Sequence, residues 1–98
     1  MQLPDWSKRL DHLKRSIRYS GDTDILPEWA NEAYADPDAA IFDPDYASIS
    51  GRSVRTIGYS KSADFLITVI TLEDNGTLWG LSAWKSNESD TRSYEEES

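Results

Sequence analysis

The chain contains no cysteine, a single histidine and no apolar run long enough to span a membrane. The lack of cysteine excludes disulfides and thiolate metal ligands, and it suits a reducing cytoplasm. A lone histidine argues against a zinc site built on histidines. The chain starts without an apolar leader, so we expect a cytoplasmic protein that is neither secreted nor membrane-bound. Its 98 residues predict a single domain over 1–98.

Basic residues are scarce, and they are segregated from the acidic ones. The net charge is −8; residues 1–21 hold five Lys/Arg against two Asp/Glu, whereas residues 22–45 hold eight acids and no base. Residues 87–98 hold five acids against one base. This balance argues against nucleic-acid binding over a broad surface, which depends on neutralising phosphates. A local basic cleft, a basic protein partner and plain solubility all stay compatible with it.

Two helices are predicted in the N-terminal third. The first covers residues 5–19, because apolar residues recur there at the spacing of one helical face: Trp6, Leu10, Leu13 and Ile17. Asp5 is its expected N-cap, and Gly21 its stop. The second covers residues 27–35, with Pro27 in the first turn and an Asp-Pro pair closing it.

The rest of the chain predicts an antiparallel meander and a final helix. The expected strands are a short edge strand at 39–42 and three longer ones at 53–60, 65–72 and 77–85. The strand at 65–72 is apolar on both faces, so we expect it at the centre. Asn75-Gly76 predicts a type I′ hairpin turn. A helix over 87–97 follows, with Asn87 and Asp90 approximating a capping box.

These elements give an α+β fold class. We expect two N-terminal helices packed on one face of an antiparallel sheet of three or four strands, with a short C-terminal helix. The opposite sheet face is then left open or is covered by a partner. Three of the four tryptophans are expected as core anchors, and Trp84, at the exit of the last strand, as the most exposed one.

Basic and aromatic residues of the sheet region form the candidate binding set. The bases come from the strands and connections that flank the central strand: Arg52, Arg55, Lys61 and Lys85. Converging on the open sheet face, they would hold a phosphate backbone, while Tyr59 and Trp84 would stack on bases of single-stranded RNA. A solvated face with aliphatic stems lying along the sheet explains the same residues.

Other polar features have simpler explanations. The triplets Asp36-Pro37-Asp38 and Asp43-Pro44-Asp45 lack the ligand spacing of a calcium loop and are expected to form turns. His12 lies on the polar side of the first predicted helix, as a general base or, more simply, as a surface residue. The sequence lacks the Ser-His-Asp order of a catalytic triad, a glycine-rich phosphate loop and a zinc-protease motif. We therefore expect neither a metal nor another cofactor.

Four segments of the C-terminal half resemble the BrnT family of bacterial toxins. They are Ile57-Gly-Tyr-Ser60, the apolar strand Phe65–Leu72, Leu81-Ser-Ala-Trp-Lys-Ser86 and Arg92-Ser-Tyr-Glu-Glu96. The register from Ser82 to Glu96 fits the family pattern without a gap. Upstream, residues 25–33 and Asp36-Pro37 look like the helix and the following Asp-Pro of the family. The resemblance covers roughly residues 25–96 and rests on short motifs.

The resemblance implies a RelE-like fold and a metal-independent ribonuclease toxin that blocks translation. It also implies a cognate antitoxin with a ribbon-helix-helix DNA-binding domain as the partner, and it leaves a homodimer open. In this reading Arg55 and Lys85 stabilise the phosphate during catalysis. Arg52 would bind the RNA backbone, and Trp84 or Tyr59 would stack on a base.

A protein-binding module without cleavage is the alternative hypothesis. Trp84 stands where the family usually has an arginine, and the net charge of −8 weakens attraction for RNA. An open sheet face and an exposed strand edge would then receive a strand or a helix of the partner. A small α+β domain with neither activity is the third interpretation.

Overall fold

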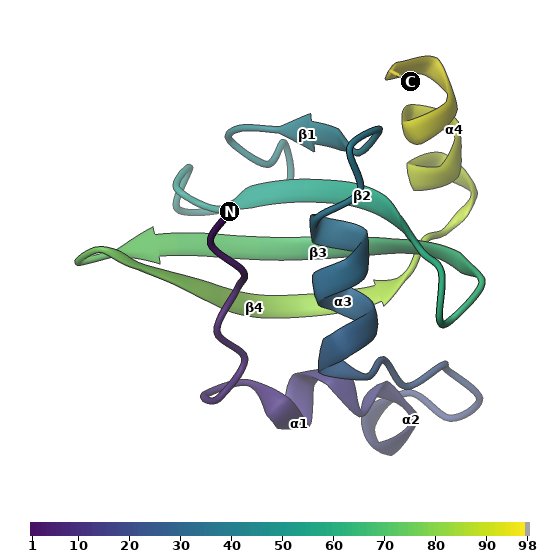
Figure 1. Ribbon diagram of the computed structural model, residues 1–98. Helices are drawn as coiled ribbons and strands as arrows, with labels where there is room; N and C mark the ends of the chain where they lie inside the picture. Colours follow the sequence, from purple (N-terminus) through teal and green to yellow (C-terminus); the bar gives the residue numbers. More distant parts are fainter. Residues whose placement is uncertain (98) are drawn as a thin grey trace.

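The computed structural model describes residues 1–97 and has an α+β fold built on a four-stranded antiparallel sheet (Figure 1). The strands are β1 (Ala40–Phe42), β2 (Val54–Ser60), β3 (Phe65–Asp74) and β4 (Thr77–Lys85), in the spatial order β1-β2-β3-β4. The helices are α1 (Leu10–Leu13), α2 (Arg15–Arg18), α3 (Pro27–Tyr34) and α4 (Glu88–Glu97). Within the described residues, none of these helices has the length and apolar character needed to cross a membrane.

The hairpin of β3 and β4 confirms the turn that the sequence predicts. Asp74 pairs with Thr77, and the two residues between them have positive φ, 51° at Asn75 and 79° at Gly76. A type I′ turn requires a positive φ at both of its central residues. All residues from Ile67 to Thr71 are buried, so the central position predicted for this strand is also confirmed. The strand runs two residues further than predicted, up to the turn itself.

The main apolar core lies between α3 and one face of the sheet. Ala30 and Ala33 of α3 are fully buried against a cluster that includes Ile67 and Val69 of β3. The helix approaches β2 so closely that a Cβ on Gly58 would lie 1.9 Å from the carbonyl oxygen of Ala33. The small residues therefore set the distance between the two layers, which brings apolar groups into close packing.

The N-terminal segment departs from the predicted helix over 5–19. Lys14, with φ −88° and ψ 67°, separates two single-turn helices, and Asp5 pairs with the free edge of β4. The Asp5 N–H donates to the Leu78 carbonyl at 2.8 Å, and the Gly80 N–H donates to the Asp5 carbonyl at 2.9 Å. Trp6 is buried against Gly80, whereas Ile17 is 77% exposed. Pairing with the strand edge satisfies backbone groups that a single long helix would leave unpaired on β4.

Helix α4 lies on the opposite sheet face from α3, which differs from the expected one-sided arrangement. Its Asp90 is hydrogen-bonded to Thr68 and Trp84, whose side chains alternate along their strands with the core residues of the α3 side. Asn87 caps the helix as predicted, accepting the Asp90 N–H at 2.8 Å. The Asp90 carboxylate points toward this sheet face, where Thr68 and Trp84 donate hydrogen bonds to it.

Candidate functional site

A basic cleft lies between the N-terminal segment and the exit of β4. Its volume is about 640 Å³, and residues of α1, α2, β2 and β4 line it: His12, Arg15, Arg18, Tyr19, Asp22, Arg55, Ser82, Trp84, Lys85 and Asn87. Four of these residues are arginine or lysine and one is acidic, on a chain whose net charge is −8. The fold therefore concentrates positive charge at one place on an acidic molecule.

Helix α2 and the turn after it form the first wall of this cleft. The Arg15 guanidinium donates to Asp22 at 2.9 Å, and it lies 5.5 Å from the ring centre of Trp84 and 4.9 Å from that of Tyr19. The backbone N–H of Thr23, more than the nearby Arg15, holds the pKa of the Asp22 carboxyl below its usual value against the opposing effect of partial burial. These contacts bind the turn to the wall formed by β4.

Arg55 lies at the bottom of the cleft in a network of buried charges. Its Nε donates to Asp45 at 2.8 Å, and its Nη1 donates to Asp90 at 2.8 Å and to the Tyr46 hydroxyl at 3.0 Å. The side chains of Arg55, Asp45 and Asp90 are 9%, 6% and 1% exposed. Burial acts to lower the pKa of Arg55, but the two carboxylates and Tyr46 outweigh it and raise that pKa above its ordinary value. One positive charge thus meets two negative charges.

Asp90 connects this network to the strands. Its second carboxylate oxygen accepts hydrogen bonds from Thr68 at 2.8 Å and from the Trp84 indole N–H at 3.2 Å. Trp84 is half-buried and fixed by this bond, so it forms a wall of the cleft.

The burial of the four tryptophans differs from the prediction of three core anchors and one exposed residue. Trp6 alone is fully buried, and the other three, Trp29, Trp79 and Trp84, are half-buried.

Arg18 and Lys85 are the cations of the cleft that have no ion pair within residues 1–97. The Lys85 ammonium lies 5.1 Å from the ring centre of Phe65, and the Arg18 guanidinium lies 5.6 Å from that of Tyr19. His12 is half-buried on the same wall as Arg18, and its Nε2 lies 3.3 Å from Nη1 of Arg9. Two unpaired cations, an imidazole and an exposed tyrosine thus surround one space.

The structure brings together three of the five predicted site residues. Arg55, Trp84 and Lys85 line the basic cleft. Arg52 lies elsewhere, 61% exposed and 3.7 Å from Asp74. Tyr59 lies in a separate hollow of about 540 Å³ beside Asp36, and its hydroxyl donates to Asp64. Arg52 and Tyr59 therefore lie outside the basic cleft that Lys85 lines.

Sequence reasoning missed Arg15, Arg18 and Tyr19, which line the cleft from the N-terminal segment. The available signal was the excess of bases in residues 1–21. In a single helix over 5–19 these bases would lie off the apolar face, toward solvent, whereas the break at Lys14 places Arg15 and Arg18 in the separate helix α2, beside the cleft. Within residues 1–97, no group of three or more histidine, aspartate or glutamate side chains is arranged to hold a metal ion.

Comparison with known protein families, with curated proteins and with solved structures finds no match for this chain.

Proposed function

We propose that this protein is a BrnT-like toxin with a RelE-like fold, and that its basic cleft binds single-stranded RNA. The observation that carries the proposal is the gathering of Arg15, Arg18 and Lys85 around Trp84 and Tyr19 on a chain of net charge −8. Cationic grooves with aromatic walls bind the backbone and the bases of single strands. The motifs of residues 57–60 and 81–96, which resemble the BrnT family, supply the assignment to toxins.

The cleft has groups for metal-independent cleavage of RNA. In this chemistry the 2′-oxygen attacks the adjacent phosphorus while the bond to the 5′-oxygen breaks, which leaves a cyclic phosphate and a 5′-hydroxyl. His12 would take the proton of the 2′-hydroxyl, and water would protonate the leaving oxygen. Lys85 and Arg18 would stabilise the charge on the phosphate. Arg55, predicted as a catalytic cation, would hold the cleft together through Asp45 and Asp90.

Binding is tested by fluorescence anisotropy with a labelled oligouridine of about ten nucleotides, at a salt concentration of about 50 mM. Arg18→Ala and Lys85→Ala should each weaken binding by about fivefold to tenfold. Lys61→Ala is the matched control, because Lys61 is an exposed base outside the cleft. If Lys61→Ala weakens binding as much as Lys85→Ala does, the attraction is general and the cleft is not the RNA site.

Cleavage is tested on the same RNA with purified protein in the presence of a metal chelator. We expect product ends that carry a cyclic phosphate, and we expect His12→Ala and Lys85→Ala to abolish both the product and the toxicity of the expressed protein. RNA that stays intact with the parent protein, together with unchanged toxicity of Lys85→Ala, would refute the ribonuclease assignment.

A second candidate is a toxin-fold protein that has lost cleavage and binds a protein partner. The specific observation in its favour is the neutralisation of Arg55 by Asp45 and Asp90, which removes a cation from the cleft. The partner would be an antitoxin with a ribbon-helix-helix domain. Co-expression with the product of the adjacent gene tests this. A stable complex, together with RNA that stays intact when this protein alone is added, selects the second candidate over the first.

A further inference from the structure

Asn87 caps helix α4, and its side chain also lines the basic cleft. Its Oδ1 accepts the N–H of Asp90 at 2.8 Å. Because only the oxygen of a side-chain amide accepts hydrogen bonds, this bond fixes which end of the amide serves the cap. The remaining NH₂ group makes no hydrogen bond with any of residues 1–97. Asn87 therefore uses its side-chain acceptor in the fold and keeps two free donors beside the cleft.

Asp90 holds this amide close to the aromatic wall of the cleft. The Trp84 indole N–H donates to the Asp90 carboxylate at 3.2 Å, and the Asp90 N–H donates to Asn87. Asp90 is 1% exposed, so the residue that connects the ring with the amide is itself fixed in the fold. Trp84 and Asn87 line the same space. A base that lies against Trp84 is therefore bordered by the Asn87 amide.

The free side-chain groups of the cleft are mainly hydrogen-bond donors. Arg18 and Lys85 carry donors alone, and neither has an ion pair within residues 1–97. The carboxylate that lines the cleft, Asp22, already has a donor on each oxygen. Its Oδ2 accepts from Arg15 at 2.9 Å, and its Oδ1 accepts the Thr23 N–H at 2.8 Å. The cleft consequently favours a ligand edge that consists of acceptors.

This preference divides the RNA bases into two classes. Uracil carries the acceptor O4 where cytosine carries an amino group, and guanine carries the acceptor O6 where adenine carries an amino group. Single-stranded RNA is read through hydrogen bonds to such edges. The amino group of cytosine or adenine would meet the Asn87 amide donor to donor and leave both groups unpaired. Unpaired donors in a binding site reduce affinity more than a merely missing contact does.

We propose that Asn87 is a specificity-determining residue that selects single-stranded RNA with a keto base, uracil or guanine, against Trp84. The inference rests on the proposed function, because it assigns the base preference of the same cleft. The NH₂ group of Asn87 donates to O4 of uracil or to O6 of guanine. Lys85 and Arg18 bind phosphates whichever base is present, so they contribute affinity and Asn87 contributes selectivity.

Fluorescence anisotropy with labelled oligouridine and oligocytidine of about ten nucleotides, at a salt concentration of about 50 mM, tests this preference. The two probes carry the same number of phosphates, so the cationic attraction cancels in the ratio of their dissociation constants. We expect oligouridine to bind about threefold to tenfold more tightly, as one hydrogen bond allows. Equal affinities would overturn this inference alone, whereas no binding of either probe would refute the proposed function and the inference with it.

Two variants of Asn87 separate the contact to the base from the helix cap. Asn87→Ser and Asn87→Asp both keep an oxygen of a favoured N-cap residue, and both remove the amide donors. Asn87→Ser should bring the ratio of the two dissociation constants close to one. Asn87→Asp should favour oligocytidine, because a carboxylate accepts from the amino group of cytosine. A ratio equal to that of the parent in either variant would overturn the proposal.

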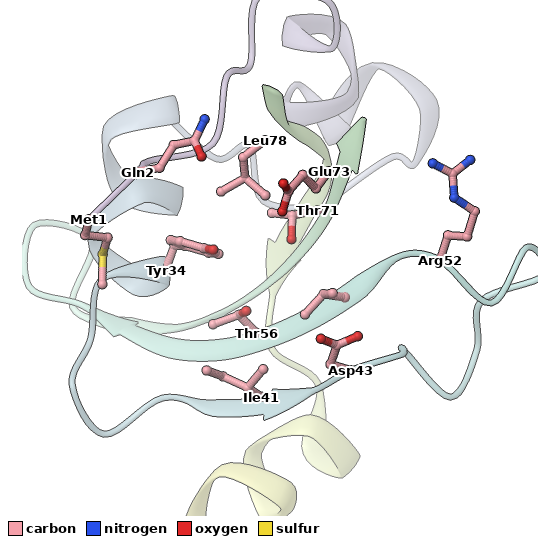
Figure 2. Close-up of a pocket in the computed structure, with 11 residues that line it drawn as sticks. Met1, Gln2, Tyr34, Ile41, Asp43, Arg52, Thr56, Thr71, Glu73 and Leu78 are labelled. Carbon is pink, nitrogen blue, oxygen red and sulfur yellow. The ribbon is translucent and has the colours of Figure 1, made fainter. Parts of the chain in front are cut away.

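Gln2→Glu is the matched control for the change in charge. Gln2 is an exposed amide in a separate groove beside α3, which none of the cleft residues lines (Figure 2). The control exchanges an amide for a carboxylate as Asn87→Asp does, but it should keep the ratio of the parent. Lys85→Ala should weaken the binding of both probes by a similar factor and also keep the ratio. A shift in Gln2→Glu as large as that in Asn87→Asp would show that net charge, and not the amide, determines the preference.

Discussion

Arg55 brings one positive charge into a place that already holds two carboxylates, and all three groups are nearly inaccessible to water. Removing charges from water is costly, and the cost is recovered only where geometry and hydrogen bonds are good. Here each hydrogen bond from the guanidinium to a carboxylate is 2.8 Å long. The guanidinium carbon also lies 4.4 Å from the ring centre of Tyr46. Arg55 is thus a residue on which the position of α4 and of the 43–53 loop depends.

Loss of Arg55 should destabilise the protein strongly. Arg55→Ala leaves the carboxylates of Asp45 and Asp90 buried without a cation, and we expect a loss of about 3–5 kcal/mol in the free energy of unfolding. Urea unfolding followed by circular dichroism measures it. The control is Arg52→Ala, which removes an exposed arginine 3.7 Å from Asp74 and should change stability by less than about 1 kcal/mol. Similar losses in the two variants would contradict a structural role for the network.

Asp36 should make stability depend on acid pH. Partial burial acts to raise the pKa of Asp36, but the N–H groups of Asp38 and Tyr59 and the hydroxyl of Tyr94 lower it more, so the folded pKa lies below its usual value. A depressed pKa contributes stability above the unfolded pKa of about 4, and this contribution is lost as the pH falls through the folded value. Asp36→Asn should cost about 1–2 kcal/mol at neutral pH.

The check is to compare urea unfolding curves of the parent protein and of Asp36→Asn at several acid pH values. Other carboxylates also have depressed pKa values, among them Asp22 and Asp24, so both proteins lose stability in acid. Only the difference between them reports on Asp36. That difference should shrink as the pH falls below the unfolded pKa of about 4 and through the lower folded pKa, and a difference that does not change with pH would refute the assignment.

At the scale of elements, the N-terminal segment is held by its pairing with β4. Trp6 packs on Gly80, where a Cβ would lie 2.4 Å from the indole ring, and the Trp6 Nε1–H donates to Asn31 of α3 at 3.0 Å. The segment thereby covers the strand edge and one end of the core together. Because α1 and α2 follow directly, this anchor also positions the wall of the basic cleft.

Gly80→Ala should disturb this anchor. The added methyl group overlaps the indole ring, and we expect a loss of about 1–3 kcal/mol together with a red shift of tryptophan emission as Trp6 becomes exposed. The matched experiment is a double-mutant cycle with Trp6→Leu, since a smaller side chain leaves room for the methyl group. The Gly80→Ala loss should fall by about 1 kcal/mol in that background. Full additivity would show that the contact does not set the position of the segment.

The elements that sequence patterns predicted well are those whose signals are local. The hairpin at Asn75-Gly76, the helix begun by Pro27 and the Asn87 cap depend on neighbouring residues, and each lies where it was expected within one or two positions. The helix over 5–19 failed because its competitor is distant in sequence. The free edge of β4 offers backbone partners to Asp5, and no pattern within residues 1–21 contains that information.

The candidate site was only partly predictable for the same reason. Lys85 and Trp84 are adjacent in sequence, and the Arg55 guanidinium lies 5.5 Å from the ring centre of Trp84. The carboxylates that neutralise Arg55 come from Asp45, in a loop, and Asp90, in α4, at sequence separations of 10 and 35 residues. The Asp-Pro-Asp triplet of residues 43–45 leads into a turn in which the Ser48 N–H donates to the Asp45 carbonyl at 2.9 Å. Its last residue gains its role only when the chain has folded.

At the scale of the whole molecule, folding separates the charges. Of the eight acids in residues 22–45, Asp22 and Asp45 pair with the bases Arg15 and Arg55, while Arg18 and Lys85 have no ion pair within residues 1–97. The basic cleft is thus a positive region on a chain whose net charge is −8. Repulsion from the distant acids is screened beyond about 10 Å at 0.1 M salt, whereas contacts inside the cleft persist.

This separation predicts a shallow salt dependence for RNA binding. For single strands the slope of log K against log salt is about −0.7 for each phosphate neutralised, so contacts from Arg15, Arg18 and Lys85 give about −1.4 to −2.1. Anisotropy titrations between about 50 and 200 mM salt measure it. Lys85→Ala should reduce the steepness by about 0.7, and Lys61→Ala should leave it unchanged. A slope much steeper than −2.1 would mean that RNA follows a wider surface than the cleft, because three cations cannot release more counterions than the phosphates that they neutralise.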